Sequence, residues 1–166
     1  MSKLIKEFYN VQNPALGAYL ISKFTVGYIN ENQSLVPLPL LFVVLPMTFR
    51  SEIVDFIVST RRTSGLRYFV EKFTEKKNLK NDLIIQIHKQ SQEYKILTME
   101  SLRLAMAKNL VTLQDGIYLI PLEGNIKKFN NNSDELGKMI KAAEKLGVWC
   151  AQLSLAEISQ ILKVRF

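Results

Sequence analysis

Two prolines, Pro39 and Pro46, enclose six consecutive apolar residues at 40–45, and this segment constrains the fold more than any other. Proline has no N–H to donate to a sheet ladder, so a strand at this place must lie between the two prolines. A continuously apolar run of this length fits a strand that is buried on both faces. The segment therefore predicts a buried core strand, with burial in a groove of a partner protein as the alternative.

Residues 51–77 predict two short amphipathic helices with a basic corner between them. Thr48 or Ser51 can cap the first helix, and Thr63 or Ser64 can cap the second. The apolar positions recur at the spacing of a single helix face. On the first helix they are Ile53, Phe56 and Ile57, and on the second they are Leu66, Phe69, Val70 and Phe73.

Most of the chain's excess positive charge lies in this corner and the helix after it. The formal net charge is +7 and the sequence pI is about 9.5. Residues 61–80 hold seven Lys and Arg side chains but only two Glu, a local excess of five. Clustered cations can bind a nucleic acid by neutralising its phosphates. The alternative is that these side chains form a solvent-exposed helix face that binds no ligand. The candidate residues for binding a partner or a phosphate are Arg61, Arg62, Arg67, Lys72 and Lys76.

A further helix is predicted over residues 14–29, because Asn13 suits the N-cap and Pro14 suits the first helical position. Gly17 and Gly27 each cost about 1 kcal/mol of helix propensity relative to Ala. They mark either tolerated irregularity or close contact with another helix or a partner. The start of this helix is a candidate partner surface, with the residues Asn13, Pro14, Leu16 and Gly17.

Residues 110–120 predict a β-hairpin, because apolar segments flank an Asp115-Gly116 turn. Two helices are predicted before it, over residues 82–95 and 99–108, with Thr98 as the cap of the second. This order is that of a winged-helix unit. We therefore expect a mainly α fold with a small β component, in which a winged-helix-like unit carries N- and C-terminal helices.

The predicted recognition helix of that unit, residues 99–108, is poorly suited to DNA. Arg103 and Lys108 are its only cations, and Asp115 at the hairpin turn would repel phosphate. A winged helix that reads DNA usually has a more basic helix and wing. This one is better suited to contact with a protein.

The chain predicts a single domain, residues 1–166, with three segments. Residues 1–49 hold a short helix at 1–11, the helix at 14–29 and the apolar strand. Residues 51–122 form the winged-helix-like part, and residues 133–166 form a helical segment. Ser133 caps its long helix, and a capping box from Ser154 to Glu157 begins the last one.

No catalytic, metal or cofactor site is indicated. His88 and Cys150 are the only residues of their types, so a metal site of closely spaced His and Cys cannot form. A Cys150–His88 nucleophilic pair has no supporting signature, and an inert thiol explains Cys150 better. The scattered glycines match neither a phosphate loop nor a dinucleotide fingerprint. We expect a protein that is not an enzyme and has no cofactor.

The expected location is the cytoplasm. The start of the chain carries no long apolar signal region. The longest apolar run, residues 35–47, is broken by prolines and is shorter than the roughly 20 residues that span a bilayer. No contact with a membrane is expected.

Several motifs, in order along nearly the whole chain, resemble the middle component of three-component ABC systems. They are NPALG at 13–17, PLPL at 37–40, LPM at 45–47, TRRTSGL at 60–66, AEKLGVW at 143–149 and VR at 164–165. The resemblance implies a small non-enzymatic subunit with a winged-helix-like part. Such a subunit would lie between an ABC-type ATPase of the chromosome-maintenance and repair class and an effector, in a bacterial anti-phage defence system.

Two functions are thus expected. The first is an adaptor whose partners are the ABC-type ATPase subunit and the effector subunit. The alternative is a winged-helix DNA-binding protein, which the net charge of +7 and the hairpin favour. The two are compatible, because a subunit beside a DNA-handling ATPase can make weak DNA contact.

Overall fold

The computed structural model describes residues 13–77, 82–122 and 134–166. The predicted helix over 1–11 and the cap at Ser133 lie outside these residues. The elements in chain order are α2 (Pro14–Asn32), β1 (Val36–Pro37), the 3-10 turn η1 (Leu38–Leu40), α3 (Leu41–Thr48), α4 (Ser51–Ser59), the 3-10 turn η2 (Arg62–Ser64), α5 (Gly65–Lys77), α6 (Asp82–Glu93), α7 (Lys95–Ala107), β2 (Val111–Gln114), β3 (Tyr118–Pro121), α8 (Asp134–Ala151) and α9 (Leu155–Leu162).

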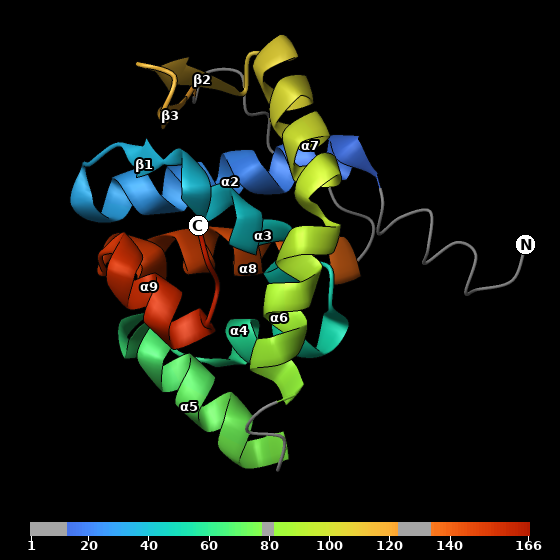
Figure 1. Cartoon of the computed structure of the whole chain (residues 1–166), viewed down its shortest axis with the longest axis vertical. Coiled ribbons are helices and arrows are strands. Elements are labelled where there is room, and N and C mark those ends of the chain that lie inside the picture. Colours follow the sequence, from blue (N-terminus) through green and yellow to red (C-terminus); the bar gives the residue numbers. More distant parts are fainter. Residues whose placement is uncertain (1–12, 78–81, 123–133) are drawn as a thin grey trace, which may run out of the picture.

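Helix α2 is the central element and lies between α7 and α8 (Figure 1). Its start is as predicted, since the Asn13 side chain accepts a hydrogen bond from the Ala15 amide at 2.8 Å. It runs past the predicted end at residue 29 and stops at Gln33, which is in the left-handed conformation with φ 55°. Leu20 and Phe24 are fully buried beneath its neighbours.

The glycines of α2 mark close contact with helices of the same chain. A Cβ atom on Gly17 would overlap the Ser101 side chain of α7, and one on Gly27 would overlap the Glu144 carbonyl of α8. From the other side, a Cβ on Gly147 would overlap the Phe24 carbonyl. The backbones of α2 and α8 therefore touch at two glycines.

The predicted strand over residues 40–45 is wrong, because this segment forms the end of η1 and most of α3. Pro39 lies at the beginning of the helical segment, where proline costs no hydrogen bond. Pro46 lies inside α3 and is tolerated there, in a helix whose Thr48 hydroxyl donates to the Val44 carbonyl. A short helix that is buried on nearly all sides has the same apolar pattern as a buried strand, so periodicity could not distinguish them.

The predicted hairpin is confirmed, and β1 adds a third strand in the antiparallel order β1-β3-β2. Asp115 and Gly116 take positive φ angles of 55° and 68° in the turn. In the register Leu119 lies opposite both Val36 and Leu113. The fold is thus mainly helical with a small sheet, as predicted, and the winged-helix comparison remains an interpretation of this order.

Two predicted caps are wrong. Helix α7 begins at Lys95, so Thr98 is buried inside it and does not cap it. Helix α4 follows Arg50 with no side-chain cap, and Thr48 instead ends α3. The capping box of α9 is confirmed, since the Glu157 carboxylate accepts from the Ser154 amide at 2.9 Å.

Candidate functional site

The predicted basic corner after α4 is held in place by Lys145 of α8. The Lys145 ammonium donates to the carbonyls of Ile57, Val58 and Thr60 at 3.0, 2.9 and 2.7 Å. The last carbonyls of a helix have no partner within it, and they favour a cation. Helix α4 has no basic residue in its last turn, so α8 supplies the charge. Burial, and then the nearby charge of Arg62, lower the pKa of Lys145.

Trp149, one turn further along α8, holds the next part of the corner. Its indole Nε1 donates to the Arg62 carbonyl at 2.8 Å, and its ring is fully buried. The ring centroid lies 5.5 Å from that of Phe69, which in turn lies 5.5 Å from that of Phe56. Aromatic packing thus joins α8, α5 and α4 below the corner.

An open groove of about 750 Å³ lies between the C-terminal half of α4 and one face of α5. Helix α4 and the corner line one side, and α5 lines the other with residues spaced at four and three positions. We call it the α4–α5 groove. Its lining residues are Phe56, Ser59, Thr60, Arg61, Ser64, Tyr68, Lys72 and Glu75.

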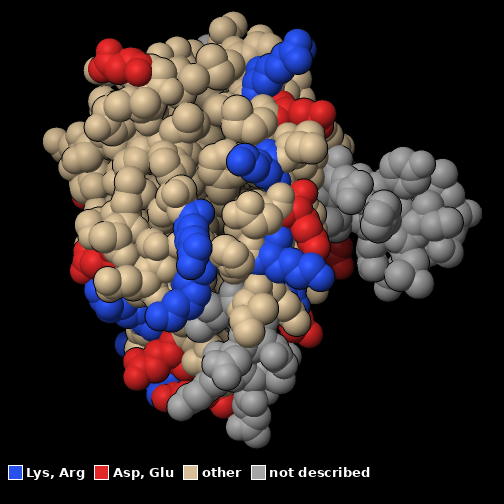
Figure 2. All heavy atoms as spheres, in the orientation of Figure 1, with Lys and Arg blue, Asp and Glu red and all other residues tan. Residues whose placement is uncertain are grey.

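Three of the predicted cations near this groove are paired with carboxylates. Arg62 lies 3.8 Å from Glu31, and Arg67 lies 2.9 Å from Glu157. Lys72 lies 2.8 Å from Glu75, and this hydrogen bond raises the Lys72 pKa. The surface over α5 accordingly shows positive and negative side chains intermingled, in the lower left of Figure 2.

Arg61 differs from these three. It is exposed and makes no ion pair within the part of the chain that the structure describes. The side chain of Lys76 lies outside the described residues. The structure therefore brings Arg61 and Lys72 together in one groove and places Arg62 and Arg67 in contacts with other elements.

The start of α2, predicted as a partner surface, divides into two parts. Asn13 is exposed and Leu16 is half-buried, but Gly17 is buried against Ser101. Pro14 is half-buried at the first helical position. The role of these residues toward a partner stays a prediction.

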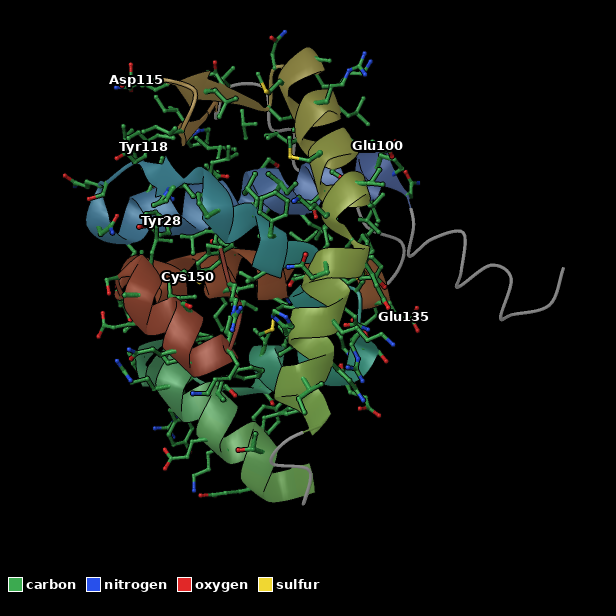
Figure 3. All side chains as sticks on the ribbon, in the orientation of Figure 1. Tyr28, Glu100, Asp115, Tyr118, Glu135 and Cys150 are labelled. Carbon is green, nitrogen blue, oxygen red and sulfur yellow. The ribbon has the colours of Figure 1, made fainter. Side chains whose placement is uncertain are left out.

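Sequence reasoning missed an exposed apolar stripe on the outer face of α7. Ile96, Met99 and Met106 are 75%, 46% and 37% exposed, and their spacing of three and seven places them along one side of the helix. Glu100 projects from the same helix (Figure 3). Part of the signal was present in the sequence, because the predicted recognition helix contains Met99 and Met106 at outward positions, with the exposed Arg103 between them.

Cys150 is fully buried in α8, and burial raises the pKa of its thiol to about 12 (Figure 3). A thiol in this setting is a poor nucleophile, because the reactive form is the thiolate. Burial also raises the pKa of Tyr28 nearby. In residues 13–77, 82–122 and 134–166, no group of three or more His, Cys, Asp or Glu could hold a metal ion.

None of the described helices has both the length and the apolar character needed to cross a membrane. A family model described as "ABC-three component (ABC-3C) system Middle Component 3" matches residues 1–166. Comparisons with curated proteins and with solved structures found no match.

Proposed function

Because the chain belongs to the Middle Component 3 family of ABC-three component systems, we propose that it is a non-enzymatic adaptor subunit. In this proposal it bridges an ABC-type ATPase of the chromosome-maintenance and repair class and an effector, in a bacterial anti-phage defence system. A component of a multi-component system has partner components, and a bridging subunit needs surfaces that bind them.

The apolar stripe of α7 is the observation that supports this proposal best. Three large apolar side chains lie exposed along one helix face, and Ile96 is three-quarters exposed. Such a face suits insertion into an apolar groove of another protein, in the helix-in-groove mode. The occupant that we propose for it is a partner subunit of the same system.

The same stripe argues against DNA reading by α7. A helix that enters the major groove contacts bases and phosphates with polar and basic side chains. Methionine and isoleucine offer no hydrogen-bond donor to base edges or phosphates. Burial of these side chains against an apolar protein surface is favourable, at about 25 cal/mol for each Å² removed from water.

Co-purification with the other two components of its system tests the adaptor role. We expect the wild-type chain to co-elute with at least one of them, and an Ile96→Glu, Met99→Glu double variant to lose at least tenfold in affinity. Ile85→Glu on α6 is the matched control, since Ile85 is also a largely exposed apolar residue, at 61%. A wild-type chain that elutes alone, or a double variant that binds as well as the control, would refute the proposal.

Weak DNA contact is the second candidate function, and the net charge of +7 favours it. Binding dominated by phosphate contacts must weaken steeply with salt. A titration of duplex DNA at low salt tests it, with Arg61→Ala as the variant. Undetectable binding, or binding that the variant leaves unchanged, would exclude the groove as a DNA site.

A further inference from the structure

We propose that the α4–α5 groove binds a short acidic segment of a partner protein. In this arrangement a carboxylate of the segment pairs with Arg61, and an apolar side chain next to it packs against Phe56 and Tyr68. The inference rests on the proposed adaptor function, because it names the chemistry of one partner contact.

Arg61 supplies the anion-binding end of the groove. Its guanidinium carries a fork of N–H donors that matches a carboxylate, and within the described residues no acidic side chain uses it. The backbone on both sides of Arg61 is held in place, because Lys145 binds the Thr60 carbonyl and Trp149 binds the Arg62 carbonyl. A preorganised backbone lowers the entropy cost of binding.

Phe56 and Tyr68 supply the apolar end. The Phe56 ring is half-buried and is held edge-on against Phe73, with ring centroids 5.2 Å apart. Tyr68 stands on the opposite wall with 45% of its surface exposed. The Lys72 ammonium lies 6.0 Å from the centre of the Tyr68 ring and leaves part of that ring uncovered. Together the two rings, one from α4 and one from α5, line the groove for one apolar side chain.

Hydroxyl groups in the lining of the groove suit the backbone of a peptide. The Ser59 hydroxyl donates to the Phe56 carbonyl at 3.0 Å, so its oxygen can still accept a hydrogen bond. Ser64 also lines the groove and is half-buried. A peptide N–H directed at either oxygen would be satisfied.

Nucleic acid fits the groove less well than an acidic peptide. Glu75 lines the groove, so a chain of phosphates would meet a carboxylate there. Lys72 is already paired with Glu75. Affinity for nucleic acid depends on several cations that displace small counterions from the phosphates. One carboxylate, in contrast, needs only the paired N–H donors of a single guanidinium group.

Photo-crosslinking from inside the groove tests this inference. Tyr68→p-benzoylphenylalanine places a crosslinker on the groove wall, in the complex with the other two components and an added single-stranded oligonucleotide. Ile96→p-benzoylphenylalanine on the α7 stripe is the parallel probe. We expect the Tyr68 position to crosslink to a partner peptide that has Asp or Glu within a few residues of the attachment site.

Affinity measurements on the same complex complete the test. We expect Arg61→Ala to weaken it about tenfold and Arg165→Ala, another exposed arginine, to leave it unchanged. The inference is overturned if the Tyr68 probe crosslinks only to the oligonucleotide or to a segment without acidic residues. It is also overturned if Arg61→Ala leaves the affinity of the complex unchanged. If the Ile96 probe crosslinks and the Tyr68 probe does not, the groove inference fails alone. If neither probe crosslinks and no component co-elutes, the adaptor function fails with it.

Discussion

Replacement of Lys145 by methionine should destabilise the protein by removing the cation at the end of α4. Methionine keeps an unbranched apolar stem of similar length, so the change isolates the ammonium group. Three carbonyls, those of Ile57, Val58 and Thr60, then lose their donor. A hydrogen bond to a charged group contributes about 1.5–3 kcal/mol.

The three bonds share one ammonium, and their contributions do not add. Burial lowers the pKa of Lys145, so the cost of desolvating the ammonium group opposes these hydrogen bonds. We therefore expect a loss of about 2–3 kcal/mol in the free energy of unfolding, which is roughly 30- to 150-fold in the folding equilibrium constant. For a chain of this size the loss corresponds to a fall of about 5–10 °C in Tm.

Urea denaturation followed by tryptophan fluorescence measures this loss, since Trp149 is the only tryptophan and lies in the same contact region. Lys141→Met is the matched control, because Lys141 lies one turn earlier on α8 and is exposed. We expect the control to change the free energy of unfolding by less than about 0.5 kcal/mol. A Lys145→Met variant as stable as this control would refute the role of Lys145 in holding the corner.

Three other perturbations follow from the packing and the pKa shifts. Gly27→Ala should lower stability by about 1–2 kcal/mol in urea denaturation, because overpacking against the Glu144 carbonyl outweighs a gain of about 1 kcal/mol in helix propensity; an unchanged or raised stability would contradict this. Because the pKa of Cys150 is about 12 in the folded state and 9.0 as a free thiol, stability is lost as pH rises above 9. Between pH 8 and 10.5 the wild type should lose about 2 kcal/mol more than Cys150→Ala, and parallel pH profiles would count against it. Hydrogen bonds from Ser154, and then from Arg67, lower the pKa of Glu157, so its stabilising effect is present above pH 4.5 and is lost as pH falls through the lowered value. An acid titration of stability should therefore be flatter for Glu157→Gln than for the wild type.

Local chemistry in the sequence was sufficient for several elements. The Asn13 cap, the Asp115-Gly116 turn and the Ser154–Glu157 box each depend on residues close together in the chain, and all three occur as predicted. The apolar run at 40–45 could not be assigned in this way. Total burial removes the periodic signal that separates a helix from a strand, and the flanking prolines are compatible with both.

The candidate site could be predicted only in part, because its partners come from distant segments. The cluster of cations was visible, but Arg62 pairs with Glu31 and Arg67 pairs with Glu157, far away in the sequence. Nothing near α4 indicated that Lys145 would end that helix. The net charge of the segment therefore overstated the number of cations available to a ligand. Only the tertiary structure shows that Arg61, among the described residues of this cluster, has no carboxylate partner.

The close contacts at the glycines of α2 fix this helix against both α7 and α8, and α2 thereby connects the two surfaces proposed for partners. Helix α7 is locked to α2 where Gly17 meets Ser101, and α8 is locked to α2 where Gly27 meets Glu144. From α8, Lys145 reaches the groove corner, and α4 and α5, which form the groove, lie in the lower half of Figure 1, whereas α7 lies at the top. A subunit bound on α7 and a segment bound in the groove would therefore be held at a fixed distance and orientation relative to each other.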